Sequence, residues 1–200
     1  MSSINFHTKE ISVKVVYYGP GLCGKTTSLQ MVYNSLPPTQ RPKLVSLATE
    51  VDRTIFFDFL PVTAYRIRDF SVRLQLYTVP GQVFYNATRK LVLNGVDGLV
   101  FVADSQRAMR DSNLESLQNL DDNLAEIGLD AARVPLVMQL NKRDLHDIDS
   151  LEDMDRLYNG KLQVPVFATV ATTGEGVVQA LRAISQLVVN DLVRKGIGRQ

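Results

Sequence analysis

The segment Gly19–Thr26 reads GPGLCGKT and places glycine, lysine and threonine at the spacing G-x-x-x-x-G-K-[ST]. Glycines in such a turn let the backbone point several N–H groups at phosphate oxygens. Lys25 would then reach the β- and γ-phosphates of a nucleotide, and the Thr26 hydroxyl would bind Mg²⁺. We expect eight consecutive or nearly consecutive residues to contact the nucleotide: Gly19, Gly21, Leu22, Cys23, Gly24, Lys25, Thr26 and Thr27.

The residues on either side of this loop favour a phosphate site over a chance glycine-rich turn. Ile11–Tyr18 (ISVKVVYY) is rich in β-branched and aromatic residues, which predicts a buried strand. Thr26–Asn34 has the composition of a helix that opens directly after the loop. A phosphate would therefore lie at a helix N-terminus, where free N–H groups and the helix dipole favour negative charge.

A second motif, Asn141-Lys142-Arg143-Asp144, follows an apolar run that ends at Leu140. This order matches the N-K-x-D guanine signature of Ras-like GTPases. The Asp144 carboxylate can accept two hydrogen bonds from a guanine ring N–H and its exocyclic amine, a donor pair that adenine lacks. The stem of Lys142 can lie over the base, and Asn141 can tie the neighbouring loops together.

The segment Thr78-Val79-Pro80-Gly81-Gln82 looks like the D-x-x-G-Q element of the same superfamily. Gly81 would give its N–H to a γ-phosphate, and Gln82 would orient the attacking water. Thr78 stands where most Ras-like proteins carry an aspartate that holds a metal-bound water. Asp58 is the nearest acidic candidate to compensate, although nothing in the sequence ties it to this role.

The segment Thr49–Thr54 (TEVDRT) is expected to be a loop before the second strand. Thr54 is placed to reach Mg²⁺ and the γ-phosphate, with Thr49 and Ser46 as alternatives. Arg53 beside it is a candidate for a built-in arginine finger that neutralises charge on the transferred phosphoryl group. The alternative is a solvated loop arginine.

Nearly the whole chain resembles one branch of the Ras-like superfamily, the MglA-like polarity GTPases of bacteria. The resemblance is carried by VYYGPGLCGKTT, ATEVDRTIFFDFLP, LYTVPGQVFYNATRKLVLNGVDGLVFVADS and QLNKRDL. It includes the unusual Thr78 and Pro80. Val170-Ala171-Thr172 looks like a divergent form of the superfamily's S-A-K loop, which implies that the Ala171 N–H contacts the guanine carbonyl.

The resemblance implies a cytoplasmic switch that binds GTP or GDP with Mg²⁺ and, in its GTP form, marks a cell pole for motility machinery. It implies two kinds of partner: polarity or motility effectors, and an MglB-like roadblock-fold homodimer that activates hydrolysis without inserting an arginine. Arg53 would then be the intrinsic catalytic arginine and Gln82 the water-orienting residue. The second strand, Ile55–Leu60, would shift register between nucleotide states.

The motifs require a scaffold that brings several strand ends together. Alternating apolar runs and amphipathic stretches predict an α/β domain with a mostly parallel, six-stranded sheet and helices on both faces. Leu36–Val51 is polar and is expected to be a long loop. The other expected strands are Ile55–Val62 and Phe70–Thr78 (antiparallel to each other), Gly98–Ala103, Val134–Leu140 and Val164–Thr169; the other helices are Phe84–Asn94, Ser112–Ile127, Leu151–Tyr158 and Val177–Arg194.

Length and composition set limits on the class of protein. Two hundred residues, 45% hydrophobic and 22% charged, suit one G domain that spans 1–200. The net charge of +1 gives no reason to expect a nucleic-acid partner. The single cysteine fits a reducing cytoplasm. The chain shows neither a long apolar run nor a lipidation signal, so we expect no direct membrane anchor.

Two other functions remain open at this point. Thr78 in place of aspartate favours a GTP-dependent binding module with little or no hydrolysis. A metabolic phosphoryl-transfer enzyme would also use a phosphate loop, but it would recognise adenine and carry a lid for its acceptor substrate. The guanine motif and the compact length argue against that enzyme.

Overall fold

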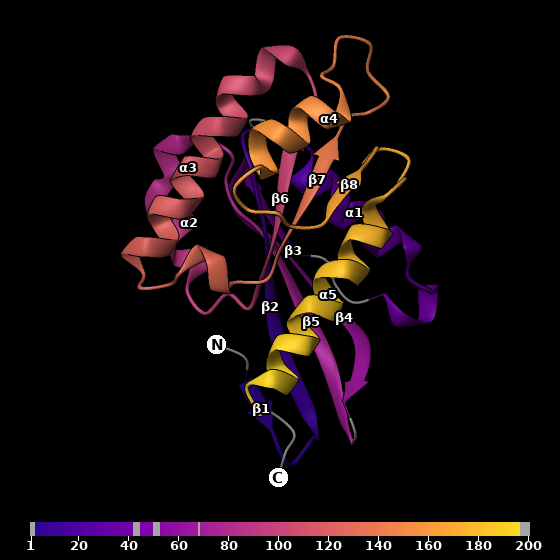
Figure 1. The fold of residues 1–200 in the computed structure, drawn as a ribbon. Coiled ribbons are helices and arrows are strands. Elements are labelled where there is room, and N and C mark those ends of the chain that lie inside the picture. The colour runs from indigo at the N-terminus through magenta and orange to yellow at the C-terminus, as the bar shows by residue number, and fades with distance from the viewer. Residues whose placement is uncertain (1–2, 42–44, 50–52, 68, 197–200) are drawn as a thin grey trace.

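The computed structural model describes residues 3–41, 45–49, 53–67 and 69–196, and it shows one central sheet with helices on both faces (Figure 1). The strand order is β3-β4-β5-β2-β6-β7-β8, and β1 pairs with β2. The strands are β1 Ser3–Asn5, β2 Glu10–Tyr18, β3 Val45–Thr49, β4 Arg53–Ile67, β5 Phe70–Thr78, β6 Gly98–Asp104, β7 Leu136–Asn141 and β8 Val166–Ala168. The helices are α1 Lys25–Ser35, α2 Asn86–Leu93, α3 Arg110–Glu126, α4 Leu151–Met154 and α5 Val177–Arg194.

The centre of the sheet is parallel, as the alternation of strands and helices predicts. β2 runs parallel to both β5 and β6, and β6, β7 and β8 continue in the same direction. β4 pairs antiparallel with β5, which confirms the predicted hairpin, and β3 and β1 pair antiparallel with β4 and β2. The expected α/β fold class is therefore confirmed.

Two apolar cores lie on opposite faces of the sheet. On one face, Val13, Val15 and Tyr17 of β2 pack in a cluster with residues of α1 and α5. On the other face, Val16 and Tyr18 pack with residues of α2, α3 and α4. This alternation along β2 is the period of two that places successive side chains on opposite faces of a strand. Figure 1 shows α2 and α3 on one side of the sheet and α1 and α5 on the other.

The predicted strand count of six is too low, because the described residues form eight strands. β3 lies inside the segment Leu36–Val51 that the polar sequence assigns to a loop, and a 3₁₀ turn, Pro38–Gln40, lies there as well. β3 reads VSLAT, is short, and has a neighbour only in β4 on the strand order. An edge strand of this kind needs no continuous apolar run, so hydrophobicity does not reveal it.

The predicted helix Leu151–Tyr158 is present in an altered form. α4 covers Leu151–Met154, and a π-helical turn continues it over Asp155–Asn159. The Ser150 side chain caps α4 by accepting a hydrogen bond from the Asp153 N–H at 3.0 Å. In the part of the chain that the structure describes, each helix is too short or too polar to cross a bilayer.

Candidate nucleotide-binding site

The predicted motifs gather at one edge of the sheet. Parallel pairing sets the carboxyl ends of β2, β5, β6, β7 and β8 side by side: Tyr17 pairs with Thr78, and Leu140 pairs with both Ala103 and Ala168. Each motif follows one of these strands directly. Ligands of open α/β sheets bind at this edge, so the topology forms a single site from segments that lie far apart in the sequence.

Two glycines of the phosphate loop are required by their surroundings. Gly19 has φ +144°, and a Cβ built on it would lie 2.2 Å from the carbonyl oxygen of Val102. Gly24 has φ +104°, and its Cβ would lie 2.2 Å from the Asn141 side-chain nitrogen. Helix α1 begins at the next residue, Lys25. The loop is thus wrapped tightly between strand β6, the guanine motif and a helix N-terminus.

The Lys25 ammonium is held across this loop. Its Nζ donates to the carbonyl oxygens of Gly19 at 2.9 Å and Pro20 at 2.6 Å, and it lies 3.6 Å from the Cys23 sulfur. Burial raises the pKa of the Cys23 thiol, so this cysteine remains a neutral filler of the loop. Lys25 therefore places a fixed positive charge at the loop where phosphate oxygens are expected.

Asn141 joins three loops, as its place in the guanine motif predicts. Its buried side-chain nitrogen donates to the carbonyl of Cys23 in the phosphate loop at 2.7 Å. Its side-chain oxygen accepts from the Thr169 hydroxyl at 3.1 Å and from the Ala171 N–H at 2.9 Å. The Ala171 N–H is the donor expected for guanine, so a guanine carbonyl would have to share it with Asn141.

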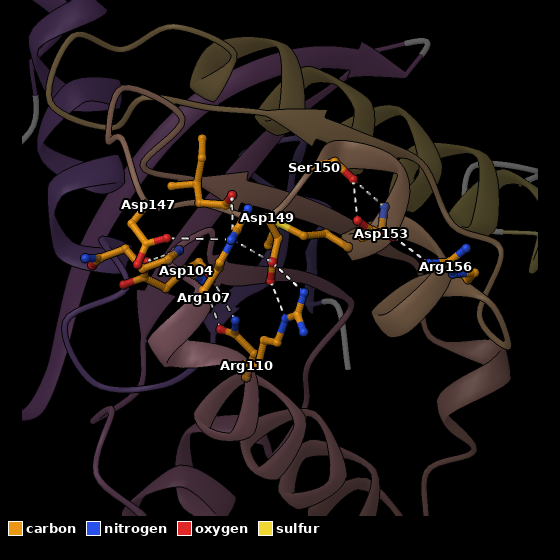
Figure 2. Close-up of polar contacts among 12 residues, drawn as sticks. Asp104, Arg107, Arg110, Asp147, Asp149, Ser150, Asp153 and Arg156 are labelled. Atoms are coloured by element: carbon orange, nitrogen blue, oxygen red, sulfur yellow. Dashed lines mark hydrogen bonds and ion pairs between the residues drawn. The ribbon is translucent and has the colours of Figure 1, made fainter.

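The Lys142 ammonium is held by residues at and just beyond the end of β6. It lies 2.5 Å from the buried Asp104 carboxylate and donates to the Gln106 side chain at 3.3 Å. Asn113 of α3 binds both backbone groups of Asp104. Its side-chain oxygen accepts from the Asp104 N–H at 2.9 Å, and its side-chain nitrogen donates to the Asp104 carbonyl at 2.8 Å. Asp104, at the end of β6, is drawn with its neighbours in Figure 2. Asp144, the expected base-reading carboxylate, is exposed at the same edge.

The segment after β5 lies directly on the phosphate loop. A Cβ built on Gly81 would lie 2.3 Å from the Gly21 Cα, so only glycine fits this contact. Gln82 lines a cavity of about 700 Å³ together with Gly21, Lys25 and Thr26. Thr78 is fully buried at the end of β5. Gly81 and Gln82 are thus beside the loop that is expected to bind the phosphates.

A buried arginine of α2 holds this segment in place. Arg89 donates from Nε to the Pro80 carbonyl at 2.9 Å and from Nη2 to the Gly81 carbonyl at 2.5 Å. Its Nη1 donates to the Asn119 side chain of α3 at 2.6 Å. The guanidinium also lies 5.2 Å from the centre of the Tyr18 ring. The backbone around Gly81 is therefore held by α2 as well as by its close contact with the phosphate loop.

Comparison with known proteins agrees with this geometry. A sequence model of the ADP-ribosylation factor (Arf) family matches residues 1–188. The chain belongs to the Arf family of small GTPases. It is 53% identical to the mutual gliding-motility protein MglA of Myxococcus xanthus (strain DK1622), over 98% of this chain and 100% of that protein. The predicted MglA-like, Ras-like identity is therefore confirmed.

Two predicted site residues of this Arf-family domain are not in a loop, contrary to expectation. Arg53 and Thr54 begin β4, where they pair with Thr49 and Ala48 of β3. The pairing of β3 with β4 includes the backbone of Thr49, Arg53 and Thr54, which the polar sequence assigns to a loop. The positions of these two side chains, and residues 50–52 between the strands, lie outside the described residues.

Sequence reasoning missed the residues that position the Arf-family motifs. Arg89 precedes Val92 by three residues and Leu93 by four, so it lies on the same buried face of α2 as these two side chains. A charged residue at that spacing on an apolar face is a signal that could have been noticed. Asn113 and Asn119 of α3, by contrast, carry no motif that would have distinguished them from surface residues.

Proposed function

We propose that this small GTPase is a GTP-dependent switch that sets cell polarity and positions motility machinery in the cytoplasm, at a cell pole when GTP is bound. The observation that carries the proposal is Asn141, whose side chain joins the phosphate loop to the guanine loop through bonds to Cys23 and Ala171. One nucleotide would thereby bind to both loops, with its phosphates at the phosphate loop and its base at the guanine loop. The similarity to a gliding-motility protein supports the process.

The residues present fit a nucleotide with Mg²⁺. The tight phosphate loop and the buried Lys25 charge suit phosphate oxygens, and Thr26, in the first turn of α1, lines the cavity. Mg²⁺ usually keeps several waters and substrate phosphates as ligands. Thr26 and Thr54 would therefore be sufficient protein ligands. The ion would neutralise charge between the β- and γ-phosphates.

The roles that we propose for this chain's own groups in hydrolysis rest on the motifs in which they lie. The Gly81 N–H would bind the γ-phosphate, Gln82 would orient the attacking water, and Arg53 would offset charge on the transferred group. We propose that a roadblock-fold homodimer holds Arg53 and Gln82 against the phosphate, so hydrolysis is slow alone and faster with this partner. Loss of the γ-phosphate would release both switch segments, with a register shift in β4.

The test is single-turnover GTP hydrolysis with and without the roadblock partner. Arg53→Ala and Gln82→Ala should each remove the stimulation and leave GTP binding intact. A matched control is Arg41→Ala, which removes an exposed arginine that donates to the carbonyls of Leu36 and Asn34 and lies 5.6 Å from the centre of the Tyr33 ring. Undiminished stimulation in both switch variants would overturn the assignment of these roles.

A binding module that hardly hydrolyses GTP is the second candidate function. Thr78 favours it, because a buried threonine ends β5 where most Ras-like proteins have a metal-facing carboxylate. Its signature would be tight GTP binding with no turnover, even with the partner present. Thr78→Asp would then be the variant that restores hydrolysis.

A further inference from the structure

An eight-residue segment, 142–149, follows strand β7 and carries Asp144, the expected base-reading residue. It ends at Asp149, which is only 4% exposed at its side chain. Figure 2 shows the Asp149 carboxylate facing the guanidinium of Arg110, at the start of α3. Two parallel hydrogen bonds join them: Nε to Oδ2 at 2.7 Å and Nη2 to Oδ1 at 2.6 Å.

The backbone of Asp149 is bound as well. Its N–H donates to the carbonyl of Ser105, just beyond β6, at 2.9 Å. Its own carbonyl accepts from the Arg143 side chain at 2.7 Å. The Arg143 N–H donates to the Thr169 carbonyl at 3.2 Å. Asp149 thus connects the guanine motif, the end of β6 and the start of α3.

These contacts hold residues on both sides of Asp144. Its neighbour Arg143 is held through both its backbone and its side chain, and the side chain is held by Asp149. Asp149 closes the loop on the other side. Asp144 itself is exposed, so packing places little constraint on its carboxylate.

The place of Arg110 in the helix supports a specific role. A positive charge in the first turn of a helix is unfavourable, because the helix dipole already places positive charge there. The bidentate pair with Asp149 compensates, since charge-assisted fork geometry is among the strongest hydrogen-bonding arrangements in proteins. The bonding to Arg110 also keeps the pKa of Asp149 below its usual range. The Arg110 side chain is 50% exposed, so replacing it removes little packing.

We propose that Arg110 is a positioning residue for guanine recognition: it holds Asp149, and Asp149 fixes the loop that aims Asp144 at the base. This inference rests on the proposed guanine-nucleotide function. It assigns Arg110 no contact with the nucleotide. Its loss should therefore weaken the reading of the base and leave phosphate binding unchanged.

The test compares dissociation of fluorescent GDP and fluorescent IDP from Arg110→Ala, Arg110→Lys and Asp149→Asn. Hypoxanthine lacks the exocyclic amine that one oxygen of Asp144 should bind. Arg110→Ala and Asp149→Asn should release GDP about tenfold faster, a factor that corresponds to about 1.4 kcal/mol. IDP release should change much less, so the preference for GDP should shrink. Arg110→Lys should recover part of it.

Arg156→Ala is the matched control. Arg156 also pairs with an aspartate, Asp153, as Figure 2 shows. The two side chains are 2.5 Å apart, and 75% of the Arg156 side chain is exposed. This variant should keep the GDP preference of the wild type. Equal acceleration of GDP and IDP release in Arg110→Ala would show a general loosening and overturn the inference. Wild-type protein that fails to bind GDP would instead refute the proposed function.

Discussion

Replacing Arg89 with methionine tests whether a buried arginine holds the segment before Gln82, the proposed catalytic glutamine. Methionine keeps an unbranched side chain but removes all three hydrogen bonds, to Pro80, Gly81 and Asn119. The contact with the Tyr18 ring would also be lost. The change is thus confined to the polar end of one side chain.

The expected change in the free energy of unfolding follows from the hydrogen-bond acceptors that lose their donor. A buried acceptor without a partner costs about 1–3 kcal/mol. The Asn119 oxygen keeps hydrogen bonds from the Tyr18 hydroxyl and the Asn123 amide, so the Pro80 and Gly81 carbonyls are the two acceptors that lose their donor. Arg89 borders the cavity beside the phosphate loop, so water could reach one of these two oxygens. We therefore expect Arg89→Met to lower the free energy of unfolding by about 3 kcal/mol, and GTP hydrolysis to fall as the Gly81 backbone loses its fixed position.

The assay is urea unfolding at saturating GDP, followed by single-turnover hydrolysis. The control is Lys90→Ala, the next residue, whose ion pair with Glu126 is exposed at the surface. Surface pairs contribute about 0–1 kcal/mol, so this variant should remain near the wild type in both measurements. If Arg89→Met lost no more stability than Lys90→Ala, the account of Arg89 would be wrong.

Three further predictions concern other parts of the site. Gly19→Ala should abolish GDP binding in a fluorescence titration, because the added Cβ would meet the Val102 carbonyl at 2.2 Å and φ is +144°; normal binding would contradict the tight-loop account. Asn141→Ala should weaken GDP affinity by about 100-fold, since three hydrogen bonds at about 1 kcal/mol each are lost; a change below threefold would count against it. The hydrogen bonds from Arg110 lower the pKa of Asp149 from its ordinary value of 3.8, so this pair stabilises the fold above pH 3.8. The stabilisation is lost as pH falls through the pKa of Asp149 in the folded protein. Asp149→Asn should therefore flatten acid unfolding curves below pH 4, and an unchanged curve would argue against the pairing.

The sequence predicts the parts of this fold that obey simple patterns. Continuous apolar runs identify the central strands, and β5 and α5 begin and end where expected, at Phe70–Thr78 and Val177–Arg194. The sequence pattern does not predict the edge strands β1 and β3, because their stability comes from pairing with a neighbour rather than from hydrophobic burial. Local polarity therefore assigns the segment that contains Thr54 to a loop, although Thr54 lies in β4.

The same division holds for the candidate site. Motifs such as Gly19–Thr26 and Asn141–Asp144 are recognisable because the ligand dictates residue types at fixed spacing. Arg89 and Arg110 act by touching backbone carbonyls or a distant carboxylate, and many sequences could supply such contacts. Only the packing of α2 and α3 against the strand ends reveals them.

The central claim is that one nucleotide is held between the phosphate loop and the guanine loop. The most direct measurement is displacement of bound fluorescent GDP by GTP and by ATP in the presence of Mg²⁺. A site built around the Asp144 carboxylate should reject adenine by a factor of about 10⁴. GTP should displace the probe near stoichiometric concentration, and ATP should fail even in large excess. Equal displacement by ATP would contradict the account.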